Sequence, residues 1–119
     1  MNINYSNDIL DTNDLDTRLD ELEESLDGLT PEQLADAEED VAELKELKEA
    51  KKYMGNDWLI GTELVNEDHF EEYVREREEE MGTLDKLPSY IVIDWEQTAE
   101  IIQSDYSVVE LMGSTFYYR

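Results

Sequence analysis

The side chains of this sequence with the clearest chemical potential are carboxylates, because they are numerous and regularly spaced. The 119 residues include 33 aspartates and glutamates but only 9 lysines and arginines, so the formal net charge is −24. Between residues 11 and 27 the acids recur along a predicted helix, where a rise of about 1.5 Å per residue gives roughly one charge per 3 Å. A DNA strand carries one phosphate per about 3.4 Å. The spacing therefore predicts an ordered anionic surface that basic, DNA-binding grooves would attract.

Two sets of these acids are the candidate partner-binding residues. The first set lies on a helix that is predicted to end near Gly28. The second set lies on a later segment, in which Arg75 and Arg77 are the only positively charged residues. The sets are Asp14, Asp16, Asp20, Glu21, Glu23, Glu24 and Asp27, and then Glu67, Asp68, Glu71, Glu72, Glu76, Glu78, Glu79 and Glu80. Because repulsion between like charges lowers the stability of a compact chain, we expect a function that offsets this cost. The competing interpretation is a solvated face that only confers solubility.

Residue types that support catalysis or metal binding are scarce. His69 is the only histidine and there is no cysteine, so a transition-metal site or a Cys–His pair cannot be assembled, and we expect His69 on the surface. The segment Asp11 to Asp16 resembles a calcium-binding loop only superficially, because Leu15 falls on a ligand position and Asp16 replaces the required glycine. The sequence therefore predicts no enzyme activity and no cofactor. A hydrolase with paired carboxylates is the minor alternative.

The charge balance also restricts the partners and the location. Binding to nucleic acid or to an anionic membrane surface needs lysine and arginine, so we expect neither, and we expect a protein partner with a basic groove instead. No stretch approaches the roughly 20 apolar residues of a membrane span. The first ten residues lack the basic and apolar regions of an export signal. With no cysteine, the composition is compatible with a reducing compartment, and the expected location is the host cell cytoplasm.

The first half of the chain has the pattern of an antiparallel helical hairpin. Leucines recur at positions 15, 19, 22 and 26, which places them on one stripe of a helix that ends near Gly28. A second helix is predicted to start at Thr30, with Pro31 in its first turn and a capping box between Thr30 and Gln33. Its apolar stripe can pack against the first helix. The stripe consists of Leu34, Ala37, Val41, Leu44 and Leu47.

Two further helices are predicted after a break at Gly55-Asn56-Asp57. Asn66 can cap a helix that ends before Gly82, and Asp94 can cap a later helix with Gln97 at the capping-box position. The expected buried faces are Phe70, Tyr73, Val74 and Met81 in the first of them, and Trp95, Thr98, Ala99 and Ile102 in the second. Between the two helices lies a short apolar run, residues 90–93, to which the sequence assigns no element.

The chain is predicted to close with a β-hairpin. The β-rich segments 108–111 and 115–118 are joined by Met112-Gly113-Ser114, where glycine admits a positive φ. The predicted fold class is therefore α+β, with an N-terminal antiparallel helical hairpin in residues 1–54 followed by a small α+β module in residues 55–119. Whether the two modules share one core is left open. The aromatics expected to hold the scaffold are Trp58, Phe70, Trp95, Tyr106 and Phe116.

Four stretches of the second module form a set of motifs. They are Asp68-His69-Phe70-Glu71-Glu72-Tyr73, Tyr90-Ile91-Val92-Ile93-Asp94-Trp95-Glu96-Gln97-Thr98-Ala99-Glu100, Ser104-Asp105-Tyr106 and Gly113-Ser114-Thr115-Phe116. In this order the set resembles the C-terminal part of ArdA-type antirestriction proteins and of phage proteins that share that module. The correspondence covers about half of the chain.

The resemblance implies DNA mimicry, because ArdA-type proteins are elongated acidic dimers that occupy the DNA-binding groove of type I restriction-modification enzymes. The resemblance implies six candidates for the mimic surface, which are Glu71, Glu72, Asp94, Glu96, Glu100 and Asp105. The resulting prediction is a non-enzymatic phage or mobile-element protein that inhibits a host defence nuclease of the restriction-modification or CRISPR type. A homodimer is part of this expectation.

The alternative belongs to a different class of protein. In it, the helical hairpin is an adaptor or assembly element whose leucine stripe pairs with a helix of a partner, and the acids form only a solvated outer face. Polar residues at Leu19 and Leu22 would then abolish partner binding, whereas the loss of scattered acids would matter little.

Overall fold

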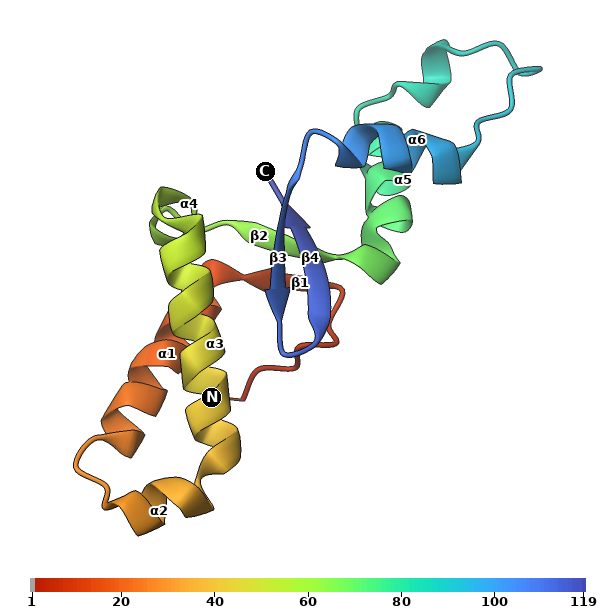
Figure 1. The fold of residues 1–119 in the computed structure, drawn as a ribbon. Helices are drawn as coiled ribbons and strands as arrows, with labels where there is room; N and C mark the ends of the chain where they lie inside the picture. The colour runs from red at the N-terminus through yellow and green to blue at the C-terminus, as the bar shows by residue number, and fades with distance from the viewer. Residues whose placement is uncertain (1) are drawn as a thin grey trace.

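The computed structural model describes residues 2–119, and its N-terminal half contains the helical hairpin that the leucine spacing predicts (Figure 1). Helix α1 spans Thr12–Leu26. It begins where the carboxylate of Asp11 accepts a hydrogen bond of 2.8 Å from the amide of Asn13, which satisfies one free N–H of the first turn. The four stripe leucines are at most 9% exposed. Their burial holds α1 against the rest of the molecule.

The second helix of the hairpin is interrupted, which the sequence did not predict. The capping box of Thr30 and Gln33 is present and starts α2, Pro31–Asp36, but the backbone leaves helical geometry at Ala37 (φ −100°, ψ 32°). Helix α3, Glu38–Met54, follows, and its first turn contains three acids. Negative side chains stabilise a helix N-terminus through the helix dipole. They therefore favour a new start at residue 38 over continuation through Ala37.

A four-stranded antiparallel sheet crosses the centre of the molecule in the order β1-β2-β4-β3 (Figure 1). The strands are β1 (Ile9–Asp11), β2 (Glu63–Asn66), β3 (Ser107–Leu111) and β4 (Ser114–Tyr118). The terminal β-hairpin agrees with the prediction, because Met112 and Gly113 form its two-residue turn with φ of 49° and 81°. Strands β1 and β2 were not predicted. They are only three and four residues long, so their sequences are too short to show a clear alternation of apolar and polar residues.

One core joins the hairpin to the sheet. Its buried residues include Leu15, Leu19 and Leu47 from the hairpin, together with Leu64 and Phe116 from the strands. Trp58 lies in the same core on α4, Asn56–Leu59, a single helical turn after the break at Gly55. The predicted modules 1–54 and 55–119 therefore share this core. In addition, β1 from the first segment pairs with β2 from the second.

A second core forms on the other face of the sheet. Side chains alternate between the faces of a strand, so Val65 and Tyr117 lie opposite to their neighbours Leu64 and Phe116 and belong to this second cluster. Helix α5 (Phe70–Glu80), preceded by the 3₁₀ helix η1 (Glu67–His69), and helix α6 (Trp95–Gln103) cover this face. The ring of Phe70 makes edge-to-face contacts with Tyr106 and Tyr117, each at 5.0 Å between centroids. The sheet thus separates the hairpin from α5 and α6.

The predicted caps of the second half are confirmed, although Asn66 caps the 3₁₀ helix η1 that leads into α5 and not α5 itself. Asn66 accepts from the amide of Asp68, and Asp94 accepts from the amide of Gln97. Most expected inward residues are buried or half-buried, but Met81 is 60% exposed, so its prediction as a core residue was wrong. It lies at the C-cap of α5, where the helical stripe no longer points at the sheet.

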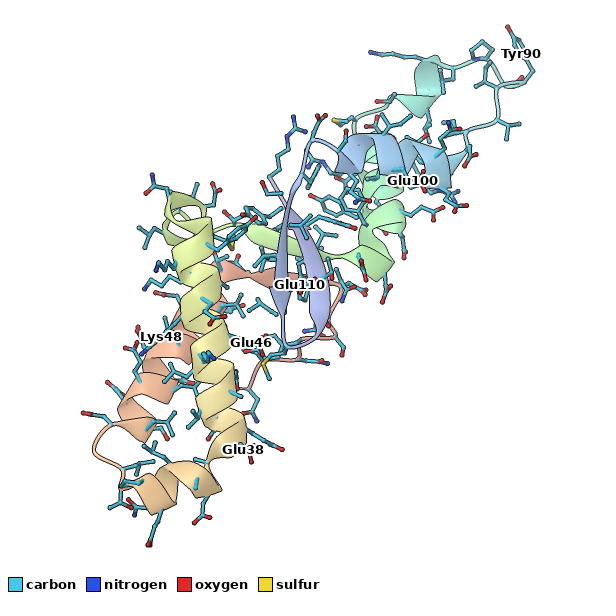
Figure 2. All side chains as sticks on the ribbon, in the orientation of Figure 1. Glu38, Glu46, Lys48, Tyr90, Glu100 and Glu110 are labelled. Atoms are coloured by element: carbon cyan, nitrogen blue, oxygen red, sulfur yellow. The ribbon has the colours of Figure 1, made fainter. Side chains whose placement is uncertain are left out.

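The connection between α5 and α6 extends from the end of the molecule (Figure 1). Residues 81–94 contain only the short 3₁₀ helix η2, Leu84–Lys86. Tyr90, Ile91 and Val92 are 81%, 47% and 92% exposed, so the apolar run of the sequence lies in solvent. Figure 2 shows Tyr90 at the tip of this loop.

In limited proteolysis, the loop of residues 81–94 should be cleaved first. We expect chymotrypsin to cleave after Tyr90, because an exposed segment without regular hydrogen bonding fits a protease cleft. Mass spectrometry of the early products should show fragments 1–90 and 91–119. Tyr53 is the matched comparison, since it is 66% exposed but lies within α3. A first cut after Tyr53 would contradict this description of the loop.

The whole molecule is a rod. Its principal extents are 66 × 24 × 22 Å, and its radius of gyration is 18.3 Å. A compact domain of this length would have a radius of gyration of about 13.5 Å. Among residues 2–119, none of the helices combines the length and the apolar sequence that a membrane span needs.

Candidate functional site

The charge per length of the rod lies within the range of DNA. Dividing the 66 Å long axis by the 24 net negative charges gives one charge per about 2.75 Å. DNA carries one phosphate per about 3.4 Å along one strand and one per about 1.7 Å when both strands are counted. The protein therefore presents more charge per length than a single strand and less than a duplex.

The first candidate set lies on the side of α1 that faces away from the leucine stripe. Asp14, Asp20, Glu24 and Asp27 are exposed there, and Glu23 is exposed with Lys48 at 3.7 Å. Glu21 is half-exposed and lies 4.0 Å from Arg18.

Asp16 differs from the other members of this set because it is bonded inside the molecule. Its Oδ1 accepts hydrogen bonds from the indole N–H of Trp58 at 2.8 Å and from the Lys51 ammonium at 3.1 Å. The indole bond lowers the pKa of Asp16 most, and Lys51 lowers it further against the opposing effect of burial. This carboxylate therefore positions α4 on the hairpin.

Part of the second candidate set lines a groove beside α5 that also contains Trp95, the first residue of α6. The groove has a volume of about 450 Å³. It is lined by Asp68, Glu71, Glu72, Arg75, Glu76, Glu79 and Trp95. Arg75 is bound within it, since its Nε lies 3.2 Å from Glu79 and its guanidinium 5.9 Å from the Trp95 ring. Five predicted acids thus meet at one groove.

The remaining predicted acids of this half lie outside the groove. Glu67 and Glu80 are exposed, and Glu78 is half-buried beside another groove that contains Arg77 and Tyr106. Asp94, Glu96, Glu100 and Asp105 are exposed on and after α6. Asp94 also caps α6, so one oxygen of its carboxylate already accepts a hydrogen bond from the helix.

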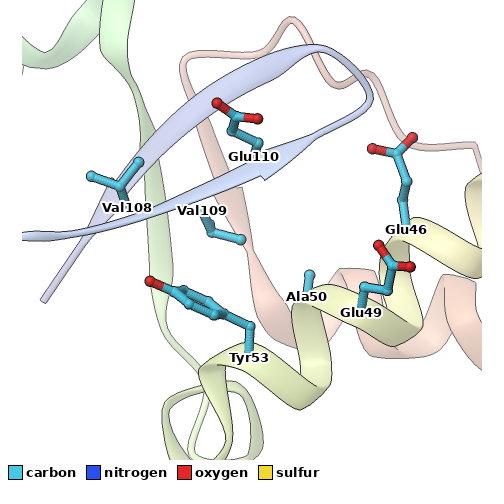
Figure 3. A pocket seen from close by; sticks show the side chains of 7 residues that line it. All are labelled: Glu46, Glu49, Ala50, Tyr53, Val108, Val109 and Glu110. Atoms are coloured by element: carbon cyan, nitrogen blue, oxygen red, sulfur yellow. The ribbon is translucent and has the colours of Figure 1, made fainter.

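The two candidate sets lie in opposite halves of the rod, with the sheet between them (Figures 1 and 2). The structure does not bring them together into one patch. Acids that the prediction did not select lie between them, at a groove of about 270 Å³ between α3 and β3. Figure 3 shows this groove, which is lined by Glu46, Glu49 and Glu110 together with Tyr53 and Val108.

Glu46 and Glu49 could have been found from the sequence, because their spacing places them on neighbouring turns of α3. Glu110 could not, since only the packing of β3 on α3 brings it near them. The groove also has a structural contact, because Glu46 accepts the amide N–H of Met112 at 3.0 Å and so holds the β3–β4 turn.

Several of the few cations are used in internal ion pairs. Arg18 makes two hydrogen bonds of 3.0 Å to Glu43, whose Oε2 also accepts the hydroxyl of Tyr5 at 2.5 Å. Burial opposes ionisation of Glu43, but the bonds from Arg18 and Tyr5 outweigh it and lower the pKa of Glu43. Burial and the hydrogen bond to Glu43 raise the pKa of Tyr5. These contacts tie the N-terminal segment, α1 and α3 together and leave the outer acids as the dominant surface charge.

Histidine and metal chemistry add little to this surface. The side chain of His69 is only 12% exposed, so it is more covered than expected, and its Nδ1 lies 3.6 Å from Asp8 and 3.5 Å from Glu72. Within residues 2–119, no group of three or more histidines, aspartates or glutamates is arranged to hold a metal ion. What the described surface offers is attraction for extended, positively charged partners.

Fold and surface together define an elongated, strongly anionic α+β protein. No protein-family model, curated protein or solved structure matches the chain. The resemblance to ArdA-type proteins stays a prediction that depends on the motif residues.

Proposed function

We propose that this protein is a DNA mimic of phage or mobile-element origin that inhibits a host defence nuclease by occupying its DNA-binding groove. The observation that carries the proposal is the rod of 66 × 24 × 22 Å with a net charge of −24. At about 3.4 Å per base pair, its length equals that of about 19 base pairs of duplex. A basic groove shaped for DNA would accommodate a body of this length and charge.

The support for mimicry comes from how the acids are held. The acids of α1 and α5 lie on helices whose opposite faces are buried, so their positions are fixed by a packed core. Fixed charges need less ordering on binding than charges on a flexible tail. Complementary charge also speeds the encounter of two proteins.

The proposal includes the class of partner and the place of action. The partner is a restriction-modification or CRISPR nuclease complex with a basic groove, and the protein acts on it in the host cytoplasm without catalysing a reaction. A homodimer would extend the anionic surface along a longer stretch of the groove.

The adaptor hypothesis receives less support. Leu15, Leu19 and Leu22 are at most 3% exposed within the protein's own core. A partner helix could reach this stripe only if the hairpin first left the sheet.

A competition assay tests the mimic. A type I restriction methyltransferase and a CRISPR effector, each bound to a fluorescent duplex of about 20 base pairs, would be titrated with the protein. We expect displacement of the duplex from at least one of them, with an apparent affinity that falls about tenfold or more between 50 mM and 200 mM salt. Inhibition of the nuclease while the duplex stays bound would contradict mimicry.

Charge-neutral variants sharpen the assay. We expect the triple variant Glu71→Gln, Glu72→Gln and Glu76→Gln to weaken displacement by about tenfold, because it removes charge from the α5 groove. The matched control is Glu32→Gln, Asp36→Asn and Glu39→Gln, which changes the net charge equally at the outer end of the hairpin. Equal losses from the two variants would mean that only total charge matters and that α5 is not a contact surface.

A further inference from the structure

The outer end of the helical hairpin contains a groove with partly exposed apolar side chains, for which the proposed DNA mimicry has no use, although three acids that line it belong to the first candidate set. The groove lies between α1 and the pair α2 and α3, and its volume is about 550 Å³. It is lined by Leu26, Leu34, Val41 and Leu44, together with Glu23, Glu24, Asp27 and Lys48. Ligand pockets in proteins commonly have volumes of about 300–1,000 Å³.

The groove exists because the second apolar stripe is only partly covered. Leu47, near the sheet, is 0% exposed, whereas Val41 is 38% exposed and Leu34 and Leu44 are half-buried. The break at Ala37 turns α2 across the end of the hairpin, so α2 does not continue the contact of α3 with α1 (Figure 1). Apolar side chains are thus left partly in water, which is unfavourable unless another surface covers them.

The charges around the groove indicate what covers it. Three acids contribute to its lining against one cation, and that cation, Lys48, lies 3.7 Å from Glu23. An apolar segment with acidic flanks would be repelled, whereas one with lysines or arginines would be attracted. A groove between helices takes an amphipathic helix whose apolar residues recur at the helical period. We propose that this groove binds an amphipathic helix with an apolar face and basic flanks on a partner protein.

The apolar contact at this second site does not depend on the proposed function, although Glu23, Glu24 and Asp27 belong both to its lining and to the candidate mimic surface. It lies at the end of the rod opposite to α5 and α6, and its attraction depends on apolar contact as well as charge (Figure 1). A DNA mimic could use it to hold a second partner, and the site would remain if the mimicry assay failed.

The direct test uses a synthetic peptide as the probe. A fluorescent peptide of about 14 residues, long enough for four helical turns, would place leucines on one face and lysines on the other. Its control peptide has the same composition with the leucines distributed around the helix. In anisotropy titrations at about 0.15 M salt, we expect the amphipathic peptide to bind about tenfold more tightly than the control. Equal affinities would overturn the proposal, since they would show attraction by charge alone.

Two pairs of variants locate the binding. Leu34→Ser with Val41→Ser should weaken the amphipathic peptide about fivefold, because both side chains line the groove. The matched control, Leu59→Ser with Ile60→Ser, removes apolar residues that are 67% and 76% exposed elsewhere and should leave the affinity unchanged. Unchanged binding by the groove variant would also overturn the proposal.

A measurement on the unaltered protein tests the site even if a variant does not fold. Methyl resonances of Leu34, Val41 and Leu44 should shift on addition of the amphipathic peptide, whereas those of Leu59 and Ile60 should not. Shifts confined to residues outside the groove would refute the site.

Discussion

Replacing Trp58 with alanine is expected to lower the free energy of unfolding by about 3–5 kcal/mol, the usual cost of removing a large aromatic side chain from a core. Trp58 is 1% exposed and packs in the core that joins the hairpin to the sheet. Its indole donates to Asp16 at 2.8 Å, and its carbonyl accepts the hydroxyl of Thr12 at 3.2 Å. The indole therefore links α4 to α1, whereas the carbonyl bond to Thr12 is made by the backbone and would remain in the alanine variant.

Urea denaturation followed by circular dichroism would measure this loss. The matched control is Trp95→Ala, because Trp95 is half-buried at the other end of the rod and should cost less than half as much. A third variant, Asp16→Asn, keeps an acceptor for the indole and should cost under about 1 kcal/mol, since the lost pair with Lys51 is exposed. A loss below 1 kcal/mol for Trp58→Ala would show that the two segments do not depend on a shared core.

Replacing Arg18 with methionine is expected to cost about 3 kcal/mol at neutral pH, as when one partner of a buried ion pair is removed. Arg18 and Glu43 are 15% and 12% exposed and share two hydrogen bonds of 3.0 Å. Without the guanidinium, Glu43 would retain its negative charge in a covered site with the Tyr5 hydroxyl as its remaining bonded partner.

The effect of Arg18→Met should depend on pH with a definite sign. In the native protein the pKa of Glu43 is lowered, so this carboxylate contributes stability above its ordinary pKa of 4.5 and loses it as the pH falls through the native pKa. In the variant, burial would raise the pKa of Glu43 instead, so the variant gains stability as the pH falls. The difference between the two proteins should therefore be largest near neutral pH and shrink below about pH 4.5.

Urea denaturation at pH 7, 5.5 and 4 would reveal this convergence. Relief of the general charge repulsion at low pH affects both proteins, and it is slightly larger in the variant because the variant has lost one positive charge. Arg75→Met is the control, because the Arg75–Glu79 pair is 58% and 48% exposed and should contribute under about 1 kcal/mol at any pH. A constant difference across the pH range would contradict the role assigned to Glu43.

The sequence also allowed part of the candidate surface to be predicted. Clustering in the sequence indicates Glu71, Glu72 and Glu76, and the structure does place them at one groove. The same clustering indicates Asp16, yet its carboxylate binds the indole of Trp58, which lies 42 residues later in the chain. Clustering in the sequence cannot separate these cases, because whether an acid faces solvent or a buried donor depends on what packs beside it.

Local patterns of the sequence by themselves determined the α+β class, the extent of α1, the caps at Thr30, Asn66 and Asp94, and the turn at Gly113. Each depends on residues within one or two helical turns or on one two-residue turn. Only the tertiary structure decided that β1 pairs with β2, as Ile9 does with Val65, and that the two halves share a core. The physical reason is that short strands are stabilised by hydrogen bonds and burial supplied by distant segments, and these leave no periodic signal in the strand itself.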